Sequence, residues 1–381
     1  MKNINETKKN LAILVPNLSG GGAERVASEL SQFLEKAGHN VFIFTEKKHT
    51  HYFFAGQIIL LKPKRIENEL IDLIYLAKEI KKYKKKYQID VSISFMEKYN
   101  MANILSKVKD KTILRICTTL SARKDLKGLY YNKKILKCLY NKADNIVVLS
   151  PHGKRDMINT YGIKRDKIKV IPNAAISRTF EKNSLWEYGD MVILSVNRIH
   201  SIKQQGILID AMQEIVKVIP NAKLLLVGND RDRYARKLKN LVGKFGLEKA
   251  VIFIGQVQNV EYYMYNSQVF VLTSLIEGFP NVVIESMNQG IPIISTDFVG
   301  PARELLGVSD KLGYGKYGIV GPRIDENKKD EQYYKNIKLF SNLIIEVLKN
   351  KEILQRYSEA SKVRAKHFSK EKIESLWRSI I

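Results

Sequence analysis

Residues 277–285 read EGFPNVVIE, after an apolar run at Val269–Leu272 and before the small and apolar pair Ser286 and Met287. This order predicts a buried strand, a tight loop and the start of a helix. In the loop, glycine permits close backbone approach, and proline suits a turn or a first helical position. Because asparagine is a preferred N-cap, we expect Asn281 to cap the helix.

The N–H groups at such a helix start favour a bound anion. Glu277 stands before this anion site, and Glu285 lies one turn into the helix, where a carboxylate can accept hydrogen bonds from vicinal hydroxyls. A phosphate site between two carboxylates that bind polyols indicates a nucleotide-sugar. Spacing alone also allows a solvated loop glutamate and a surface helix glutamate.

The longer segment Ser274–Met287, SLIEGFPNVVIESM, resembles the signature of retaining family-four glycosyltransferases. The resemblance implies an α/β protein of the GT-B fold, in which two Rossmann-like doubly wound domains face each other across a deep cleft. A C-terminal helix then crosses back to the N-terminal domain. The similarity spans nearly the whole chain, and it is strongest from Met191 to Val320 and looser from Ile43 to Ser150.

A chain of 381 residues is expected to form two domains, each with its own core. The apolar run Leu11–Val15 is too short for a signal peptide, and no stretch reaches the about 18 apolar residues of a membrane span. We therefore expect a cytoplasmic protein. Cys117 and Cys138 lack the spacing of a metal site or redox pair, so both are interpreted as reduced packing residues.

The formal net charge of +25 calls for a partner of opposite sign: nucleic acid, an anionic membrane surface or a phosphorylated substrate. Residues 61–142 carry 21 Lys or Arg against 8 Asp or Glu, so the charge belongs to the N-terminal half. There, an apolar helical pattern over Leu70–Ile80 ends in the lysine cluster Lys81–Tyr87. This pattern fits either a solvated helix end or a surface for acidic headgroups.

Apolar runs and helical periodicity alternate along both halves. Strands are predicted at residues 9–15, 41–45, 58–61, 89–95, 112–117, 146–149, 167–173, 191–196, 223–227, 251–254 and 268–272, and helices at 70–87, 124–141, 206–218, 234–245, 261–266 and along the tail, 336–381. We predict an N-terminal acceptor-binding domain at 1–175 and a C-terminal nucleotide-sugar domain at 190–365. The resemblance implies that a helix at about 366–381 packs back on the first domain.

A glycine-rich loop, Asn17–Arg25, follows the first strand and precedes a helix. This layout suits a phosphate, but the last glycine of a dinucleotide fingerprint is replaced by Arg25, so a plain tight turn fits as well. The run from Gly21 to Arg25 also resembles the opening of the same glycosyltransferase family. That resemblance implies that Gly21 and Gly22 close over the donor from the opposite domain.

A second basic loop, Asn197–Gln205, follows the first strand of the second domain. The planar fork of Arg198 and the point charge of Lys203 suit a departing diphosphate, although a basic loop is ordinary in so basic a chain. Both residues match the family's diphosphate clamp. The resemblance implies catalytic roles for Arg198, Lys203 and Glu277, with Glu277 on the donor hexose. It implies donor binding by Glu285 on the ribose, by the amides of Phe279 to Val282, and by Gly278, Phe279, Pro280, Asn281, Val282, Gly21 and Gly22.

The segment Asp230-Arg231-Asp232 has the Asp-x-Asp form that holds a divalent ion in another glycosyltransferase architecture. Its two arginine neighbours offset its charge, so we interpret it as a solvated loop. No metal and no cofactor beyond the nucleotide-sugar is expected. His200 and His152 are possible proton carriers, although a structural role is more common for such residues.

Acceptor recognition departs from the family pattern. Thr118, Thr119 and Ser121 stand where many relatives have a histidine near the acceptor, which leaves the proton shuttle open. The segment Gly300–Leu305 resembles that of members that use UDP-hexoses or UDP-N-acetylhexosamines.

The leading hypothesis is a retaining hexosyltransferase of bacterial cell-envelope polysaccharide biosynthesis. It would move a hexose or N-acetylhexosamine from a nucleotide-sugar, with UDP favoured, to a lipid-linked or polysaccharide acceptor. The basic N-terminal domain would dock as a peripheral protein on the inner face of the cell membrane. The alternatives are a nucleotide-sugar epimerase of the same fold and a basic nucleic-acid-binding protein. Against the latter, the basic stretch shows none of the familiar base-reading motifs, so no nucleic-acid partner is expected.

Overall fold

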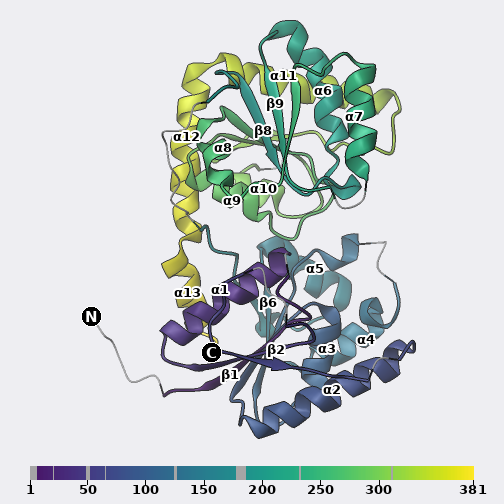
Figure 1. Cartoon of the computed structure of the whole chain (residues 1–381), viewed down its shortest axis with the longest axis vertical. Coiled ribbons are helices and arrows are strands. Elements are labelled where there is room, and N and C mark those ends of the chain that lie inside the picture. Colours follow the sequence, from purple (N-terminus) through teal and green to yellow (C-terminus); the bar gives the residue numbers. More distant parts are fainter. Residues whose placement is uncertain are drawn as a thin grey trace. The chain divides into compact units, whose positions relative to one another are not determined.

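The computed structural model describes residues 7–19, 21–48, 52–64, 66–123, 127–176, 186–230, 233–309 and 312–381. The chain divides into two compact units (Figure 1): Met1–Asn173 with Ile373–Ile381, and Ala174–Lys372. The stretch predicted to link the two domains, residues 174–190, lies largely outside the described residues. Each unit is built on one sheet of seven strands.

The sheet of the first unit is parallel throughout and has the order β3-β2-β1-β4-β5-β6-β7. Its strands are β1 (Asn10–Leu14), β2 (Asn40–Thr45), β3 (Gln57–Leu60), β4 (Val91–Phe95), β5 (Lys111–Arg115), β6 (Asn145–Val148) and β7 (Ile168–Val170). The residues from Leu11 to Leu14 are fully buried, as expected for a parallel strand covered on both faces. The strand order reverses between β1 and β4, which is where doubly wound sheets bind ligands.

Helices cover this sheet. They are α1 (Gly22–Lys36), α2 (Glu69–Lys86), α3 (Glu97–Leu105), α4 (Lys133–Tyr140) and α5 (Pro151–Tyr161), with single 3-10 turns η1 (Leu120–Ala122), η2 (Leu129–Tyr131) and η3 (Arg165–Lys167). The longest of them, α2, packs against α3, and both are visible in Figure 1. Among the described residues, no helix has the length and apolar character needed to cross a bilayer.

The helix predicted over residues 124–141 is shorter than expected, and that prediction was wrong in its first half. The regular helix starts at Lys133, because the Asn132 side chain caps it by accepting hydrogen bonds from the amides of Lys134 and Ile135. Before it, Gly128 has a φ of 90°, which a helix cannot contain. Residues 124–126 lie outside the described part of the chain.

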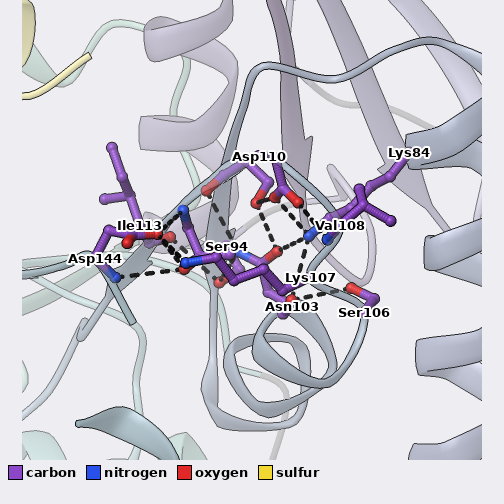
Figure 2. Close-up of polar contacts among 11 residues, drawn as sticks. Lys84, Ser94, Asn103, Ser106, Lys107, Val108, Asp110, Ile113 and Asp144 are labelled. Carbon is purple, nitrogen blue, oxygen red and sulfur yellow. Dashed lines mark hydrogen bonds and ion pairs between the residues drawn. The ribbon is translucent and has the colours of Figure 1, made fainter. Parts of the chain in front are cut away.

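A buried polar cluster joins α2, α3 and β4 in the first unit (Figure 2). The Nζ atom of Lys84 lies 2.8 Å from Asp110 Oδ2 and 2.6 Å from Asn103 Oδ1, and Ser92 Oγ donates to the same Asp110 oxygen at 2.5 Å. Lys84 and Asp110 are both inaccessible to solvent. The lysine cluster predicted at residues 81–87 therefore contains one internal lysine among its exposed neighbours.

The second sheet has the order β10-β9-β8-β11-β12-β14-β13, and only the edge strand β13 is antiparallel. Its strands are β8 (Val192–Val196), β9 (Lys223–Val227), β10 (Val251–Gly255), β11 (Val269–Leu272), β12 (Ile293–Thr296), β13 (Gly313–Tyr314) and β14 (Ile319–Gly321). The order reverses between β8 and β11, as it does between β1 and β4 in the first sheet. Both units are therefore Rossmann-like.

The helices of the second unit are α6 (Gly206–Val218), α7 (Tyr234–Lys244), α8 (Val260–Asn266), α9 (Asn281–Asn288), α10 (Ala302–Leu306), α11 (Glu331–Lys349) and α12 (Lys351–Ala365), with the 3-10 turns η4 (Ser201–Lys203) and η5 (Lys366–Phe368). The helical tail expected over residues 336–381 is broken at Asn350, whose side chain accepts from the amide of Ile353 and caps α12.

The last residues of the chain belong to the first unit. The final helix, α13 (Lys370–Arg378), buries Trp377, which lies beside the fully buried guanidinium of Arg115 at 5.8 Å from the ring centroid. The Arg378 guanidinium lies over the Phe33 ring, and the Nζ atom of Lys9 donates to the carbonyl of Ile381. These contacts tie the C-terminus to α1 and β1.

Candidate functional site

The central strands β8 and β11 are neighbours in the second sheet. The loops that follow them, residues 197–205 and 273–280, therefore leave the sheet side by side at its carboxyl edge, at the point where the strand order reverses. These are the basic loop and the glutamate loop of the sequence analysis. The fold brings them together from positions about seventy residues apart.

One direct contact joins the two loops. The Nζ atom of Lys203 lies 2.5 Å from Glu277 Oε1, and Ser274 Oγ donates to the same oxygen at 2.7 Å. Both charged side chains are mostly shielded, with 14% and 13% of their surface exposed. Glu277 is thus held by two donors, and its charge is matched by Lys203.

Backbone contacts fix the geometry of this pair. The amide of Leu275 donates to the carbonyl of Ile202 at 2.8 Å, and Thr273 Oγ1 donates to the carbonyl of Lys203 at 2.9 Å. His200 caps the turn η4, because its Nδ1 atom accepts from the amide of Ile202 at 3.1 Å. This contact gives His200 a structural task in positioning Lys203.

Arg198 occupies the same loop but is exposed to solvent. Its carbonyl accepts a hydrogen bond of 2.8 Å from Gln205 Nε2, which is buried below the loop. Gly228, with a φ of 146°, allows the neighbouring turn to approach, since a Cβ atom there would lie 1.8 Å from the carbonyl oxygen of Asn197. The backbone of Arg198 is therefore fixed, while its guanidinium faces solvent.

A third loop, after β12, supports the glutamate loop from its other side. The amide of Glu277 donates to Val299 at 3.1 Å, and the amide of Val299 donates to Leu275 at 3.0 Å. Gly300 has a φ of 147°, and a Cβ atom at that position would lie 2.3 Å from the carbonyl oxygen of Glu277. Beyond it, Arg303 pairs with Asp297 at 2.8 Å.

The helix after the glutamate loop begins one residue earlier than predicted. Pro280 is its N-cap, with extended backbone (φ −77°, ψ 99°), and Asn281 is its first residue. The prediction that Asn281 caps the helix was therefore wrong, because Pro280 already supplies the extended cap conformation. Glu285 lies one turn into the helix and is 7% exposed.

The side chains of the turn have separate tasks. Phe279 is buried against Phe368, with ring centroids 5.4 Å apart in an edge-to-face arrangement, so its side chain anchors the loop to the second unit's last turn. Gly278, Pro280 and Asn281 form the turn between Glu277 and α9, and Val282 is half-buried in the first turn of the helix.

In the first unit, Gly21 is the N-cap of α1 and Gly22 is the first helical residue. A Cβ atom on Gly21 would lie 2.0 Å from Glu24 Oε2, so the buried Glu24 carboxylate shares this helix start. The amide of Arg25 donates to the carbonyl of Gly21, and its side chain pairs with Glu29 at 3.2 Å. Gly20 lies outside the described residues.

The Asp-x-Asp segment is described only at Asp230, whose backbone bridges to Ile199. Arg231 and Asp232 lie outside the described residues. Within the described ranges, no three His, Cys, Asp or Glu side chains are grouped as a metal site would require. The expectation of a metal-free reaction stays a prediction.

The two cysteines differ. Burial raises the pKa of Cys117 to about 11, so its thiol is protonated at neutral pH, as expected for a packing residue. Cys138 is exposed, and the interpretation of it as a packing residue was wrong. The short helix α4 turns Leu136 and Tyr140 inward, which places Cys138 between them on the outer face.

Sequence reasoning assigned no role to Ser274 or Thr273, although both contact the Lys203–Glu277 pair. The available signal was their position: polar hydroxyls directly after a buried strand lie at the ligand-binding edge of a parallel sheet.

Two Rossmann-like units, each with its strand order reversing at a central pair, define the class of protein as GT-B. The crystal structure of Anabaena HepE in complex with UDP has this fold, with a TM-score of 0.76 at 18% identity over 97% of this chain and 98% of that one. The family model described as "Glycosyltransferase Family 4" matches residues 20–175, and the family model described as "Glycosyl transferases group 1" matches residues 177–313. The chain belongs to the family-four glycosyltransferases.

Two relatives are similar along much or all of their length. A glycosyltransferase of Methanocaldococcus jannaschii is 30% identical over 67% of this chain and 68% of its own. The second is the N-acetylgalactosamine-N,N'-diacetylbacillosaminyl-diphospho-undecaprenol 4-alpha-N-acetylgalactosaminyltransferase of Campylobacter jejuni. It is 27% identical over 96% of this chain and 97% of its own.

Proposed function

We propose that the protein transfers a hexose or N-acetylhexosamine, with retention at the anomeric carbon, from a UDP-sugar to a lipid-linked or polysaccharide acceptor at the cytoplasmic membrane face. The contact between Lys203 and Glu277 carries this proposal. It sets one cation and one acid at the carboxyl edge of a doubly wound sheet, where such sheets bind nucleotides.

In this proposal, Lys203 and Arg198 stabilise the diphosphate as it leaves. Negative charge grows on the phosphate oxygen while the bond to the anomeric carbon breaks, and cations placed there lower the barrier. Arg198 is exposed, so it can reach a bound ligand without breaking a contact of its side chain in the core. When the diphosphate binds, Lys203 must give up part of its contact with Glu277 in order to contact the phosphate.

The glutamate loop supplies the remaining donor contacts. Glu277 binds hydroxyls of the donor hexose, and the amides of Phe279, Asn281 and Val282, around the start of α9, bind the phosphate, since Pro280 has no N–H group. Glu285, one turn further, binds the ribose hydroxyls. Gly21 and Gly22 close over the donor from the first unit.

The relatives support the donor and acceptor of this proposal. HepE binds UDP in its crystal structure, and the Campylobacter enzyme is named for transfer of N-acetylgalactosamine to a sugar on diphospho-undecaprenol. The name of the Campylobacter enzyme favours transfer over the epimerase alternative, whereas UDP binding fits both. Both findings favour transfer over nucleic-acid binding, which rested on net charge alone.

Retention needs no carboxylate nucleophile in this proposal. The anomeric carbon loses its bond to the UDP oxygen and gains one to the acceptor oxygen on the same face, and the acceptor proton passes to the departing phosphate. Glu277, already held by Lys203 and Ser274, then acts by orienting the hexose.

Helix α2 is the proposed membrane contact. Leu70, Ile71 and Ile74 are large aliphatic side chains with 53%, 41% and 40% of their surface exposed. The same helix continues into four exposed lysines, Lys81, Lys82, Lys85 and Lys86. Exposed aliphatic residues beside a lysine cluster suit an interface with anionic lipid. The sequence pattern suggested the lysine cluster as a surface for acidic headgroups. It did not show that these aliphatic side chains of the apolar helical pattern are exposed beside it.

Calorimetry with UDP, GDP, ADP and CMP tests the donor, and NMR of the product with the preferred UDP-sugar tests retention. We expect UDP to bind most tightly, in EDTA as well as in buffer with magnesium, and the product to keep the donor's anomeric configuration. Free sugar epimers formed from donor alone would refute transfer, and an inverted product would refute retention.

A further inference from the structure

A cavity of about 590 Å³ is lined entirely by residues of the first unit. It is lined by residues that follow β1, β2 and β4, together with residues of α2 and η2. The strand order reverses between β1 and β4, so the cavity occupies the ligand-binding edge of this sheet. Its volume is in the range of small-molecule sites, roughly 300–1,000 Å³.

The lining of this cavity is acidic although the surrounding sequence is strongly basic. Glu46, Asp72 and Glu97 contribute carboxylates, whereas the lining cations are Lys47 and Lys98. The Nζ atom of Lys98 lies 2.5 Å from Asp72 Oδ2, so its charge is already matched. Among the described lining residues, the other cation is Lys47, which is exposed to solvent.

Glu97 is the most unusual of these carboxylates. It is 8% exposed, and the one hydrogen bond recorded for its side chain, within the described residues, comes from its own backbone amide. Burial raises its pKa, and the positive charge of Arg123 offsets only part of that effect. Because this carboxylate lines the cavity, it can accept further hydrogen bonds from a bound ligand.

The residue before Glu97 is held in a backbone conformation that normally belongs to glycine. Met96 has φ 71° and ψ 148°, and it directly precedes α3. Strain of this kind persists when surrounding structure enforces it, and it is common at binding sites. Here it turns the chain so that Glu97 lines the cavity at the first position of the helix.

Tyrosines complete the lining. Tyr99 donates from its hydroxyl to Glu46 Oε1 at 2.6 Å, and the hydroxyl of Tyr130 donates to the carbonyl of Glu69 at 3.1 Å. Burial, together with the negative charges of Asp72, Glu69 and Glu46, raises the pKa of Tyr130 to about 12. The cavity therefore combines aromatic rings with a negative potential.

We propose that this cavity binds an uncharged sugar ring of the acceptor, with Glu97 accepting hydrogen bonds from its hydroxyl or N-acetyl N–H groups. Hydroxyls supply donors to the Glu97 carboxylate, and the C–H face of a pyranose packs on tyrosine rings. Phosphate and uronic acid groups are disfavoured, because they would enter beside the buried Glu97 carboxylate. This inference rests on the proposed function, since it names the acceptor class.

The test is saturation-transfer NMR on the full chain with methyl glycosides of glucose, galactose, N-acetylglucosamine and N-acetylgalactosamine. Methyl glucuronide, glucosamine and inorganic phosphate are the charged comparisons. We expect at least one neutral glycoside to bind more tightly than each charged probe. Glu97→Gln should weaken that binding by at least about fivefold, Asp72→Asn should also weaken it, and the exposed control Asp166→Asn should not.

Calorimetric binding of UDP is measured on the same variants and should not change, because the proposed nucleotide site lies in the second unit. Glycoside binding that is unaltered in both Glu97→Gln and Asp72→Asn would overturn the inference. Tighter binding of phosphate, methyl glucuronide or glucosamine than of every neutral glycoside would also overturn it. The same holds if the protein binds UDP but none of the glycosides. If the unaltered protein does not bind UDP, the proposed donor is refuted instead.

Discussion

Lys203 Nζ and Glu277 Oε1 lie 2.5 Å apart, although 74 positions separate the two residues in the chain. They come from the loops after two adjacent central strands, and Ser274 adds a second donor to the same carboxylate oxygen. A diphosphate that binds at this edge must compete with Glu277 for the lysine. In the proposed function, catalysis and donor binding would therefore be coupled through this one contact.

Replacing Lys203 with methionine should lower kcat/KM by about 10²–10³-fold, because the departing phosphate loses a cation. Glu277→Gln should also reduce it, and the double variant should lose less than the sum of the two effects, since the residues contact each other. Steady-state kinetics with the UDP-sugar measures this. Lys217→Met is the matched control, since Lys217 forms an exposed pair with Glu214; strict additivity would show that the contact has no part in turnover.

Arg198→Ala should reduce kcat by about 10²-fold while the Kd for UDP changes by less than about threefold, since the charge on the phosphate grows only during the reaction. The side chain is exposed, so the melting temperature should stay unchanged. The exposed Arg236→Ala variant is the control. A large loss of UDP affinity with kcat preserved would assign Arg198 to ground-state binding.

Glu285→Ala should weaken UDP binding by about tenfold or more, because the ribose hydroxyls lose a charged acceptor. Calorimetry measures this, with the exposed Glu352→Ala variant as a control. Glu285 is buried, so Glu285→Gln, which keeps the size of the side chain, separates ligand binding from folding. Equal UDP affinity in both Glu285 variants and the unaltered protein would remove Glu285 from the site.

Lys84→Met should destabilise the first unit by about 3–5 kcal/mol, because it leaves the buried Asp110 carboxylate unpaired. Burial lowers the pKa of Lys84 to about 8, below its ordinary value of 10.5. Between those two pH values the unfolded chain holds a proton that the folded chain has released. This lysine therefore makes the fold more stable as pH rises from 8 to 10.5.

Urea unfolding at pH 7.5 and 9.5 measures this dependence. Trp377 belongs to the first unit and Trp186 to the second, so fluorescence in a Trp186→Phe background reports the first unit alone. The free energy of unfolding should rise between the two pH values by more in the protein with Lys84 than in Lys84→Met. An equal change in both would show that Lys84 does not release its proton in the fold.

Replacing Leu70, Ile71 and Ile74 with serine should release the protein from phosphatidylglycerol vesicles at low salt without lowering its melting temperature, because these side chains are exposed. Changing Lys81, Lys82, Lys85 and Lys86 to glutamine should weaken binding and its salt dependence, by roughly 1 kcal/mol per lysine. Vesicle sedimentation measures both. Substitution of the exposed Lys217 and Lys239 is the control, and unchanged sedimentation of both α2 variants would exclude this helix as the docking surface.

Much of the fold is predictable from local sequence. Every strand expected from an apolar run is present, because strands buried on both faces are mostly apolar along their length. The predictions fail where backbone conformation, rather than apolar periodicity, determines the structure. The helix α3 begins at Glu97, directly after the strained residue Met96, and the helix expected over residues 124–141 begins only at Lys133, beyond Gly128. No element was assigned around β12 to β14, which are short strands between loops.

For the site, the sequence placed the basic loop and the glutamate loop directly after predicted strands, and the sheet order then showed that these strands, β8 and β11, are neighbours. Family resemblance added the residues on those loops. Only the tertiary structure could show that Lys203 contacts Glu277 directly while Arg198 is exposed, because side-chain direction depends on turns such as η4.

Apolar periodicity and turn residues specified the two parallel sheets, since burial and backbone hydrogen bonding act along each segment. Which charges are paired is a property of packing between distant segments. Lys84 is internal among exposed lysines, and Glu97 is buried at a cavity in a basic domain. Neighbours along the chain do not reveal this, because desolvation depends on everything that surrounds a group in space.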